Sequence, residues 1–137
     1  MSWSFTVPGQ PVTTNHAYRT GKMPVKRGGR QVMNADMTPK VIHRPVLTDE
    51  GKTWRDAVQT IAQISKPSRW RPSGQLRVII DLRLADAQDA DGSLKLILDG
   101  LKRAIDYDDK HFLPCVRSME SGRPLRDACV IVTVEDA

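Results

Sequence analysis

Hydrophobic and polar residues alternate along several short segments of the chain, with the two-residue period of a β-strand that is buried on one side. Near the N-terminus, Trp3, Phe5 and Val7 alternate with serine and threonine, and a Pro-Gly pair ends the pattern. Three later segments, with the same alternation or many β-branched residues, predict strands at 75–86, 111–120 and 127–136. Pro114 indicates an edge or bulge position for the second of these.

Two other segments carry apolar residues every three or four positions, the spacing of an amphipathic helix. In 48–64, an apolar face around Trp54 follows Thr48 and Asp49, either of which can cap the helix. In 91–105, the predicted buried stripe consists of Leu94, Ile97, Leu98, Leu101 and Ile105. Strands outnumber helices without alternating regularly with them, so we expect an α+β fold with two layers, in which helices pack on one face of a mixed sheet.

Length and composition are consistent with one modest hydrophobic core. At 137 residues and 39% hydrophobic content the chain is too short for two ordinary domains, so a single domain should span 1–137. Cys115 and Cys129 stand among apolar neighbours, and we expect reduced thiols packed in the core. No apolar run reaches the roughly 20 residues that span a bilayer, and the N-terminus lacks a signal-peptide pattern, which predicts a soluble, cytoplasmic protein.

Positive charge is concentrated in one part of the chain. The net charge is +5, and between Arg19 and Arg44 there are seven lysines or arginines but only one acid, Asp36. Glycines and prolines in this stretch predict a basic loop or excursion at about 20–45. It is either a solubilising surface loop or an arm that grips phosphates. In the second case, the candidate DNA-binding residues are Arg19, Lys22, Lys26, Arg27 and Arg30.

The segment "DADGSLKLILDG" (89–100) begins like a calcium-binding loop and continues like a helix. A calcium loop with Gly92 at its sixth position would need oxygen ligands at its first and twelfth positions, where Ala87 and Leu98 stand. A better interpretation is a strand-to-helix corner that carries Asp89 and Asp91. On the helix that follows, Lys95, Asp99 and Lys102 share roughly one face with Asp91.

A second acidic pair, Asp108 and Asp109, follows the predicted helix. If these carboxylates converge with Asp89 and Asp91, they form an oxygen-rich site suited to Mg²⁺ or Mn²⁺, and Lys95 could stabilise negative charge on a phosphate. The alternative is structural. Asp89 and Asp91 would then cap a helix, and the second pair would make a turn.

These residues resemble the RusA-type Holliday junction resolvases of bacteria and their prophages. That family has two aspartates separated by one residue and usually followed by asparagine, a lysine four positions later, an aspartate four further on, and an acidic pair at the start of a strand. The matching residues here are Asp89, Asp91, Lys95, Asp99, Asp108 and Asp109. The segments "FTVPGQPVTTNHAYR", "LTDEGKTWRDAV" and "VTVED" also resemble the family, so only the basic stretch at about 20–45 lies outside the likeness.

The resemblance implies a crossover junction endodeoxyribonuclease, a hydrolase of DNA recombination and repair. Asp89, Asp91 and Asp109 would be catalytic and metal-binding, Asp108 an auxiliary metal ligand, and Lys95 the catalytic lysine. The family also implies a homodimer that makes paired, symmetric nicks in a four-way junction, with Mg²⁺ as cofactor and no membrane partner. Gly92 departs from the usual asparagine.

Two other functions compete with this one. A non-catalytic DNA-binding protein would use only the basic surface, and divalent ions would stimulate no nicking. A calcium-binding module would bind Ca²⁺ tightly without DNA and without any need for Asp109.

Overall fold

The computed structural model describes all residues, 1–137, and is organised around a four-stranded sheet. Its strands are β1 (Ser2–Pro8), β6 (Leu76–Arg83), β7 (Phe112–Glu120) and β8 (Cys129–Asp136). The order across the sheet is β1-β8-β6-β7; β6 and β7 run parallel and the other neighbours antiparallel. The predicted mixed sheet is thus confirmed, and Pro114 lies on the edge strand β7.

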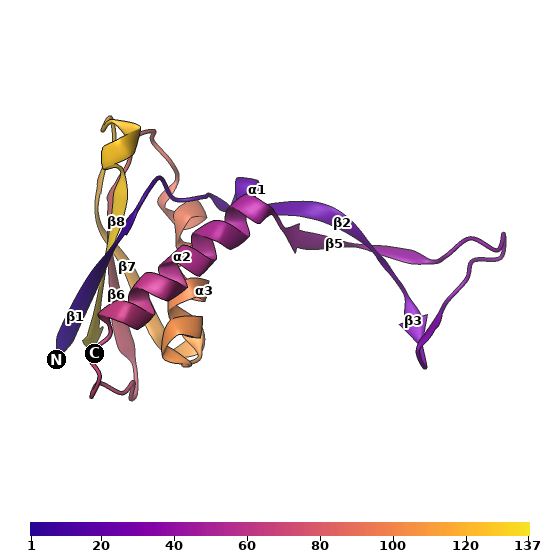
Figure 1. Cartoon of the computed structure of the whole chain (residues 1–137), viewed down its shortest axis with the longest axis horizontal. Coiled ribbons are helices and arrows are strands. Elements are labelled where there is room, and N and C mark those ends of the chain that lie inside the picture. The colour runs from indigo at the N-terminus through magenta and orange to yellow at the C-terminus, as the bar shows by residue number, and fades with distance from the viewer.

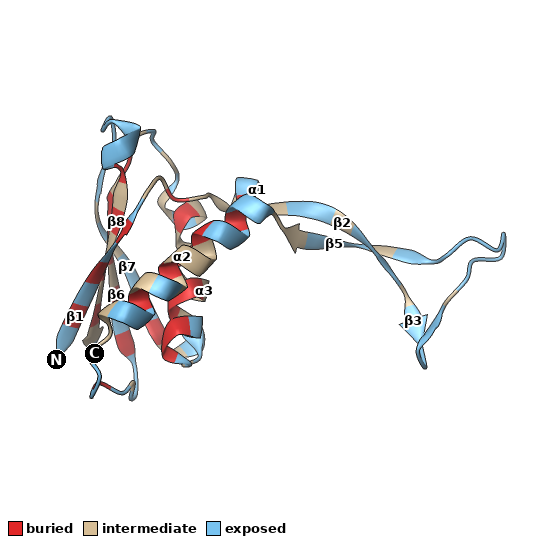
Figure 2. Cartoon of the chain, viewed as in Figure 1, coloured by how far each residue is buried: buried red, intermediate tan, exposed pale blue.

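Two long helices, α2 (Asp49–Ser65) and α3 (Ala90–Ile105), lie on the same side of this sheet (Figure 1). The buried residues gather between the helices and the sheet (Figure 2), where 22 of them form one hydrophobic cluster. The inward residues of β1 and β6 are buried as their alternation predicts. Together the sheet and these helices form the body of the molecule, a single α+β domain.

Helix α3 buries a stripe that differs slightly from the predicted one. Leu96, Ile97 and Leu101 are almost completely buried, whereas Leu94 and Leu98 are only partly buried. The stripe lies nearer to Leu96 because α3 packs against α2 as well as against the sheet. The two helices come so close at Gly100 that a β-carbon there would lie 2.8 Å from the backbone oxygen of Arg55.

The other face of the sheet is not covered by a helix (Figure 1), and it carries charged and polar side chains beside the half-buried Ile79 and Ile131. Asp81 of β6 is buried there, and it accepts hydrogen bonds from Arg117 and Ser118 of β7. The Arg117 guanidinium, which donates from Nε at 3.2 Å and also from its terminal nitrogen, lowers the pKa of Asp81.

The expectation of two core thiols is wrong: both are free, but Cys115 is exposed and Cys129 only half-buried, because neither side chain points into the helix-covered core.

Residues 18–47 form an arm that leaves the body beside the short helix α1 (Thr14–Ala17) (Figure 1). The arm is an antiparallel ribbon of β2 (Tyr18–Pro24) and β5 (Val41–Leu47), with a small hairpin of β3 (Lys26–Arg27) and β4 (Arg30–Gln31) beyond it. The basic stretch is thus an excursion, as one of the two predicted alternatives has it, but it is built from paired strands and not from an irregular loop, because strands far apart in sequence pair with each other. No residue of the arm is buried (Figure 2).

Two 3-10 turns complete the chain, η1 (Asp109–His111) before β7 and η2 (Leu125–Asp127) before β8. None of the helices has the length and apolar character needed to cross a membrane.

Candidate functional site at the base of the basic arm

The corner between β6 and α3 carries two exposed carboxylates that have no partner in the protein. Asp89 is the N-cap residue of α3 but makes no side-chain capping hydrogen bond, and Asp91 lies in the first turn. Neither carboxylate forms a hydrogen bond or a salt bridge with another residue. The positive end of the α3 dipole favours negative charge at both positions. A role at the helix N-terminus therefore explains why aspartates occur at these two positions, but the carboxylate oxygens remain available to a ligand.

Hydrogen bonds from the segment that follows β1 hold this corner in place. The Gln10 amide accepts from the backbone N–H of Ala85 (2.8 Å) and donates to the carbonyl of Asp86 (3.0 Å). The Thr14 hydroxyl donates to the carbonyl of Gly92 (3.2 Å). At Gly92 a β-carbon would meet only the Thr13 side chain, at 3.7 Å, so this position has room for a larger residue.

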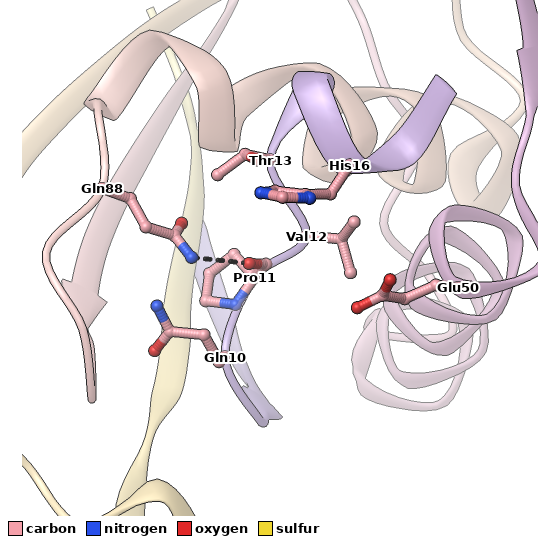
Figure 3. A pocket seen from close by; sticks show the side chains of 7 residues that line it. All are labelled: Gln10, Pro11, Val12, Thr13, His16, Glu50 and Gln88. Atoms are coloured by element: carbon pink, nitrogen blue, oxygen red, sulfur yellow. Dashed lines mark hydrogen bonds between the residues drawn. The ribbon is translucent and has the colours of Figure 1, made fainter. Parts of the chain in front are cut away.

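Gln88, just before the acidic pair, extends this network and lines a pocket (Figure 3). Its amide donates to the carbonyl of Pro11 (2.8 Å) and accepts from the hydroxyl of Ser93 (2.8 Å), which is completely buried. Glu50 of α2 and His16 of α1 face the same pocket from the other side (Figure 3). The sequence reasoning missed these supporting residues. In the sequence, only glutamines beside turn residues could have indicated this support, and such glutamines are common in loops of every kind.

Lys95 lies at the base of the arm, one turn into α3 from Asp91. Its ammonium nitrogen is 5.8 Å from the centre of the Tyr18 ring, within the range of a cation–π interaction. Thr14, Tyr18, Pro45 and Lys95 line a hollow between α3 and the start of the arm. Lys95 is exposed and forms no salt bridge, so it can receive an anion that reaches this hollow.

The second acidic pair lies at the opposite end of α3. The helix has 16 residues and is therefore about 24 Å long, with Asp89 before its start and Asp108 and Asp109 after its end. The four carboxylates therefore do not converge within one chain, because β6 and β7 are parallel and α3 must run the full length of the sheet between them. Nowhere do three His, Cys, Asp or Glu side chains gather closely enough to hold an ion.

Unlike the first pair, the second pair has partners in the protein. Asp108 accepts a hydrogen bond from the backbone N–H of Lys110 (3.1 Å), which lowers the pKa of Asp108. Asp109 forms a salt bridge with Lys102 of α3 (3.6 Å). For Asp108 the predicted turn role is confirmed. Asp99 lies between the two pairs, half-buried, beside a hollow that it shares with Arg55, Lys102 and Arg103.

The candidate DNA-binding residues all lie on the arm and are all exposed. They are Arg19, Lys22, Lys26, Arg27 and Arg30, joined by Lys40 and Arg44 from the returning strand. None of the seven pairs with a carboxylate. Their charge is therefore available to a partner. His111 is far from the arm and stacks on Tyr107 beyond the end of α3.

The comparison with known proteins does not decide among the functions considered above. No family model matches the chain, and no curated protein is significantly similar to it. The resemblance to the junction resolvases therefore stays a prediction that rests on its motif.

The donor atoms at the corner suit a hard divalent cation. Mg²⁺ keeps several of its waters and commonly binds through one or two carboxylates together with a substrate phosphate. Asp89 and Asp91 offer two carboxylates without competing partners, whereas Asp109 of the same chain cannot reach them. Within one chain the corner thus supplies two carboxylate donors of the kind that Mg²⁺ binds, and the remaining ligands would come from water and a bound phosphate.

Proposed function

We propose that this protein is a Mg²⁺-dependent endodeoxyribonuclease that cuts branched DNA, a crossover junction endodeoxyribonuclease. The observation that carries the proposal is the placement of two unpartnered carboxylates and Lys95 at the base of an arm with seven unpaired cations. A duplex held along the arm would bring its phosphate backbone to the corner. Attraction to phosphates supplies most of the affinity of such a surface and steers the substrate towards it.

In this proposal each group at the corner has a distinct role. Asp89 and Asp91 would hold Mg²⁺ or Mn²⁺, which supplies charge neutralisation and a more acidic bound water when present. Lys95 would contact the phosphate and stabilise the negative charge that develops during hydrolysis. Tyr18, whose ring centre lies 5.8 Å from the Lys95 ammonium nitrogen, would help to hold this lysine beside the hollow at the base of the arm.

Asp109 would join this site only from a second copy of the chain. It lies beyond the far end of α3, so a two-fold dimer with antiparallel α3 helices is the arrangement that would bring it to the partner's acidic corner. In this geometry each of the two sites would contain Asp89 and Asp91 of one copy and Asp109 of the other. Such a homodimer has two equivalent sites, as paired nicks in a four-way junction require.

Loss of one carboxylate tests the proposed chemistry. Asp91→Asn should reduce Mg²⁺-dependent nicking of a synthetic four-way junction by at least about 100-fold, the usual scale for a group that stabilises the transition state, while junction binding is retained. Asp49→Asn is the matched control, because it also removes an exposed carboxylate from the first turn of a long helix. Equal nicking by the Asp91→Asn variant and the wild type would contradict the assignment.

Mixing of two inactive variants tests the shared site. Asp91→Asn and Asp109→Asn homodimers should each be inactive, but a mixed dimer would contain one site with all its carboxylates intact. Nicking of one junction strand should therefore reappear after mixing. A site built within one chain predicts no recovery, because every site would then lack one carboxylate.

A non-catalytic DNA-binding protein is the second candidate, and the unpaired cations of the arm favour it equally. Replacement of Lys22, Lys26, Arg27 and Arg30 by glutamine should lower the slope of log affinity against log salt by about 1 for each phosphate that the variant no longer neutralises. Both functions share this result. Comparison of nicking in Mg²⁺ and in EDTA separates them, since only the nuclease depends on the ion.

A further inference from the structure

The arm ends in two turns that differ in chemistry. One is the β3–β4 hairpin, with Lys26, Arg27 and Arg30 around its glycines. The other, residues 34–38, forms the far end of the arm (Figure 1) and carries no lysine or arginine. A bridge between Met33 and Pro39 closes its base. The charge that would hold a phosphate backbone thus flanks this second turn without entering it.

Hydrogen bonds give the 34–38 turn a fixed shape. The backbone N–H of Asn34 donates to the carbonyl of Thr38 (2.8 Å), and the N–H of Met37 donates to the carbonyl of Asn34 (3.0 Å). The Asp36 carboxylate accepts from the hydroxyl and the N–H of Thr38, and the hydroxyl bond lowers the pKa of Asp36. The single acid of the arm is therefore used to shape the turn.

This turn holds the backbone of Met37 in an unfavourable conformation. Its φ is +69°, in the left-handed region that residues other than glycine, asparagine and aspartate rarely occupy, at a cost of about 1 kcal/mol or more. Met37 is 76% exposed, and Met33 at the base of the turn is 45% exposed. Two apolar side chains thus project from the end of a cationic arm and make no contact with the hydrophobic core.

We propose that the 34–38 turn acts as a wedge that inserts Met37 between neighbouring base pairs of bound DNA. A two-stranded ribbon has dimensions that fit a DNA groove, and cations on both strands of the arm would grip the phosphates on either side. Proteins that bend DNA commonly insert an apolar side chain, including methionine, at a base step. The inference rests on the proposed function only in that the partner is DNA; it requires no cleavage.

Fluorescence of 2-aminopurine, a base analogue that brightens when it is unstacked, tests the wedge directly. The analogue is placed at successive positions of a duplex and of a four-way junction, and EDTA prevents cleavage. Wild-type protein should raise the emission at one or two positions by several-fold. Met37→Ala should abolish this rise and weaken binding by about threefold to tenfold, while the salt dependence is unchanged because every cation remains.

Two further variants act as controls. Met119→Ala removes a methionine that is also exposed, at 49%, but lies on β7 of the body, and it should leave both the emission and the affinity unchanged. Met37→Leu keeps an apolar side chain and should preserve most of the rise. A Met37→Ala variant with wild-type emission would overturn the wedge.

Failure of the wedge and failure of the nuclease give different results. If the protein unstacks bases but shows no Mg²⁺-dependent nicking, the wedge is supported and the nuclease proposal is wrong. If it nicks the junction but unstacks no base, the nuclease is supported and the wedge is wrong. Absence of any DNA binding would overturn both.

Binding to vesicles that contain phosphatidylserine tests a different partner. If Met37→Ala impaired this binding and had no effect on DNA, the turn would bind a membrane surface and the wedge would be wrong.

Discussion

The body and the arm of this protein are stabilised in different ways. In the body, alternate residues of four strands and the facing sides of two helices share one hydrophobic cluster, so each element depends on the others. In the arm, backbone pairing between β2 and β5 continues without a single buried side chain. Isolated two-stranded ribbons are at best marginally stable in water. The contrast indicates that the body provides the stability of the molecule, while the arm is an extension whose sequence is free to serve a partner.

Loss of core volume should give the largest effect on stability. Leu101→Ala removes a completely buried side chain of α3 and should lower the free energy of unfolding by about 2–5 kcal/mol. Urea denaturation measures this change. Leu125→Ala, which truncates a leucine that is 68% exposed, should change it by less than about 0.5 kcal/mol.

The close approach of α2 and α3 should tolerate no added methyl group. Gly100→Ala gains helix propensity but places a β-carbon 2.8 Å from the Arg55 oxygen and from Val58, so we expect a net loss of about 1–3 kcal/mol. Gly92→Ala is the matched control in the same helix, because its β-carbon would meet Thr13 at an ordinary 3.7 Å. If both variants were equally stable, the tight helix contact would be disproved.

The ion pair on the open face of the body should make stability depend on pH. The pKa of Asp81 is lowered in the folded state by Arg117, so the unfolded chain binds more protons in acid. The stabilisation is present above the ordinary pKa of about 3.8 and is lost as the pH falls below it. Arg117→Met should destabilise the protein at pH 6 and destabilise it less at pH 3, measured by urea denaturation at each pH. An equal cost at both values would rule out this pair as the cause.

Shortening the arm should have the smallest effect on stability. If a two-residue Asn-Gly turn replaces residues 22–43, it joins Gly21 to Arg44, which are already paired across the ribbon. The free energy of unfolding of the body, measured by thermal denaturation, should then change by less than about 0.5 kcal/mol, because no buried residue is removed. If the arm binds DNA as proposed, the affinity for DNA should nevertheless fall sharply. A large loss of stability would show that the arm belongs to the folding unit and would abolish the contrast drawn above.

Local sequence patterns predicted the body well. The alternation around Phe5 and Ile80 identified buried strand faces, and Thr48 caps α2 as its position before the helix indicates. The arm was harder to predict, because Tyr18 and Leu47 pair although they are far apart in the sequence, and neither strand has a buried face to reveal its period. Exposed ribbons of this kind carry turn residues and charge, which are equally typical of loops.

The sequence by itself determined the strands and long helices of the body and the position of the exposed carboxylates between them. The strand-to-helix corner with Asp89 and Asp91 follows from hydrophobic period and turn chemistry, which act over a few neighbouring residues. Only the tertiary structure decided which charged groups meet. Because β6 and β7 are parallel, α3 separates the two acidic pairs by its full length and commits Asp109 to Lys102. The same packing sets Lys95 against Tyr18 and so joins the acidic corner to the base of the arm.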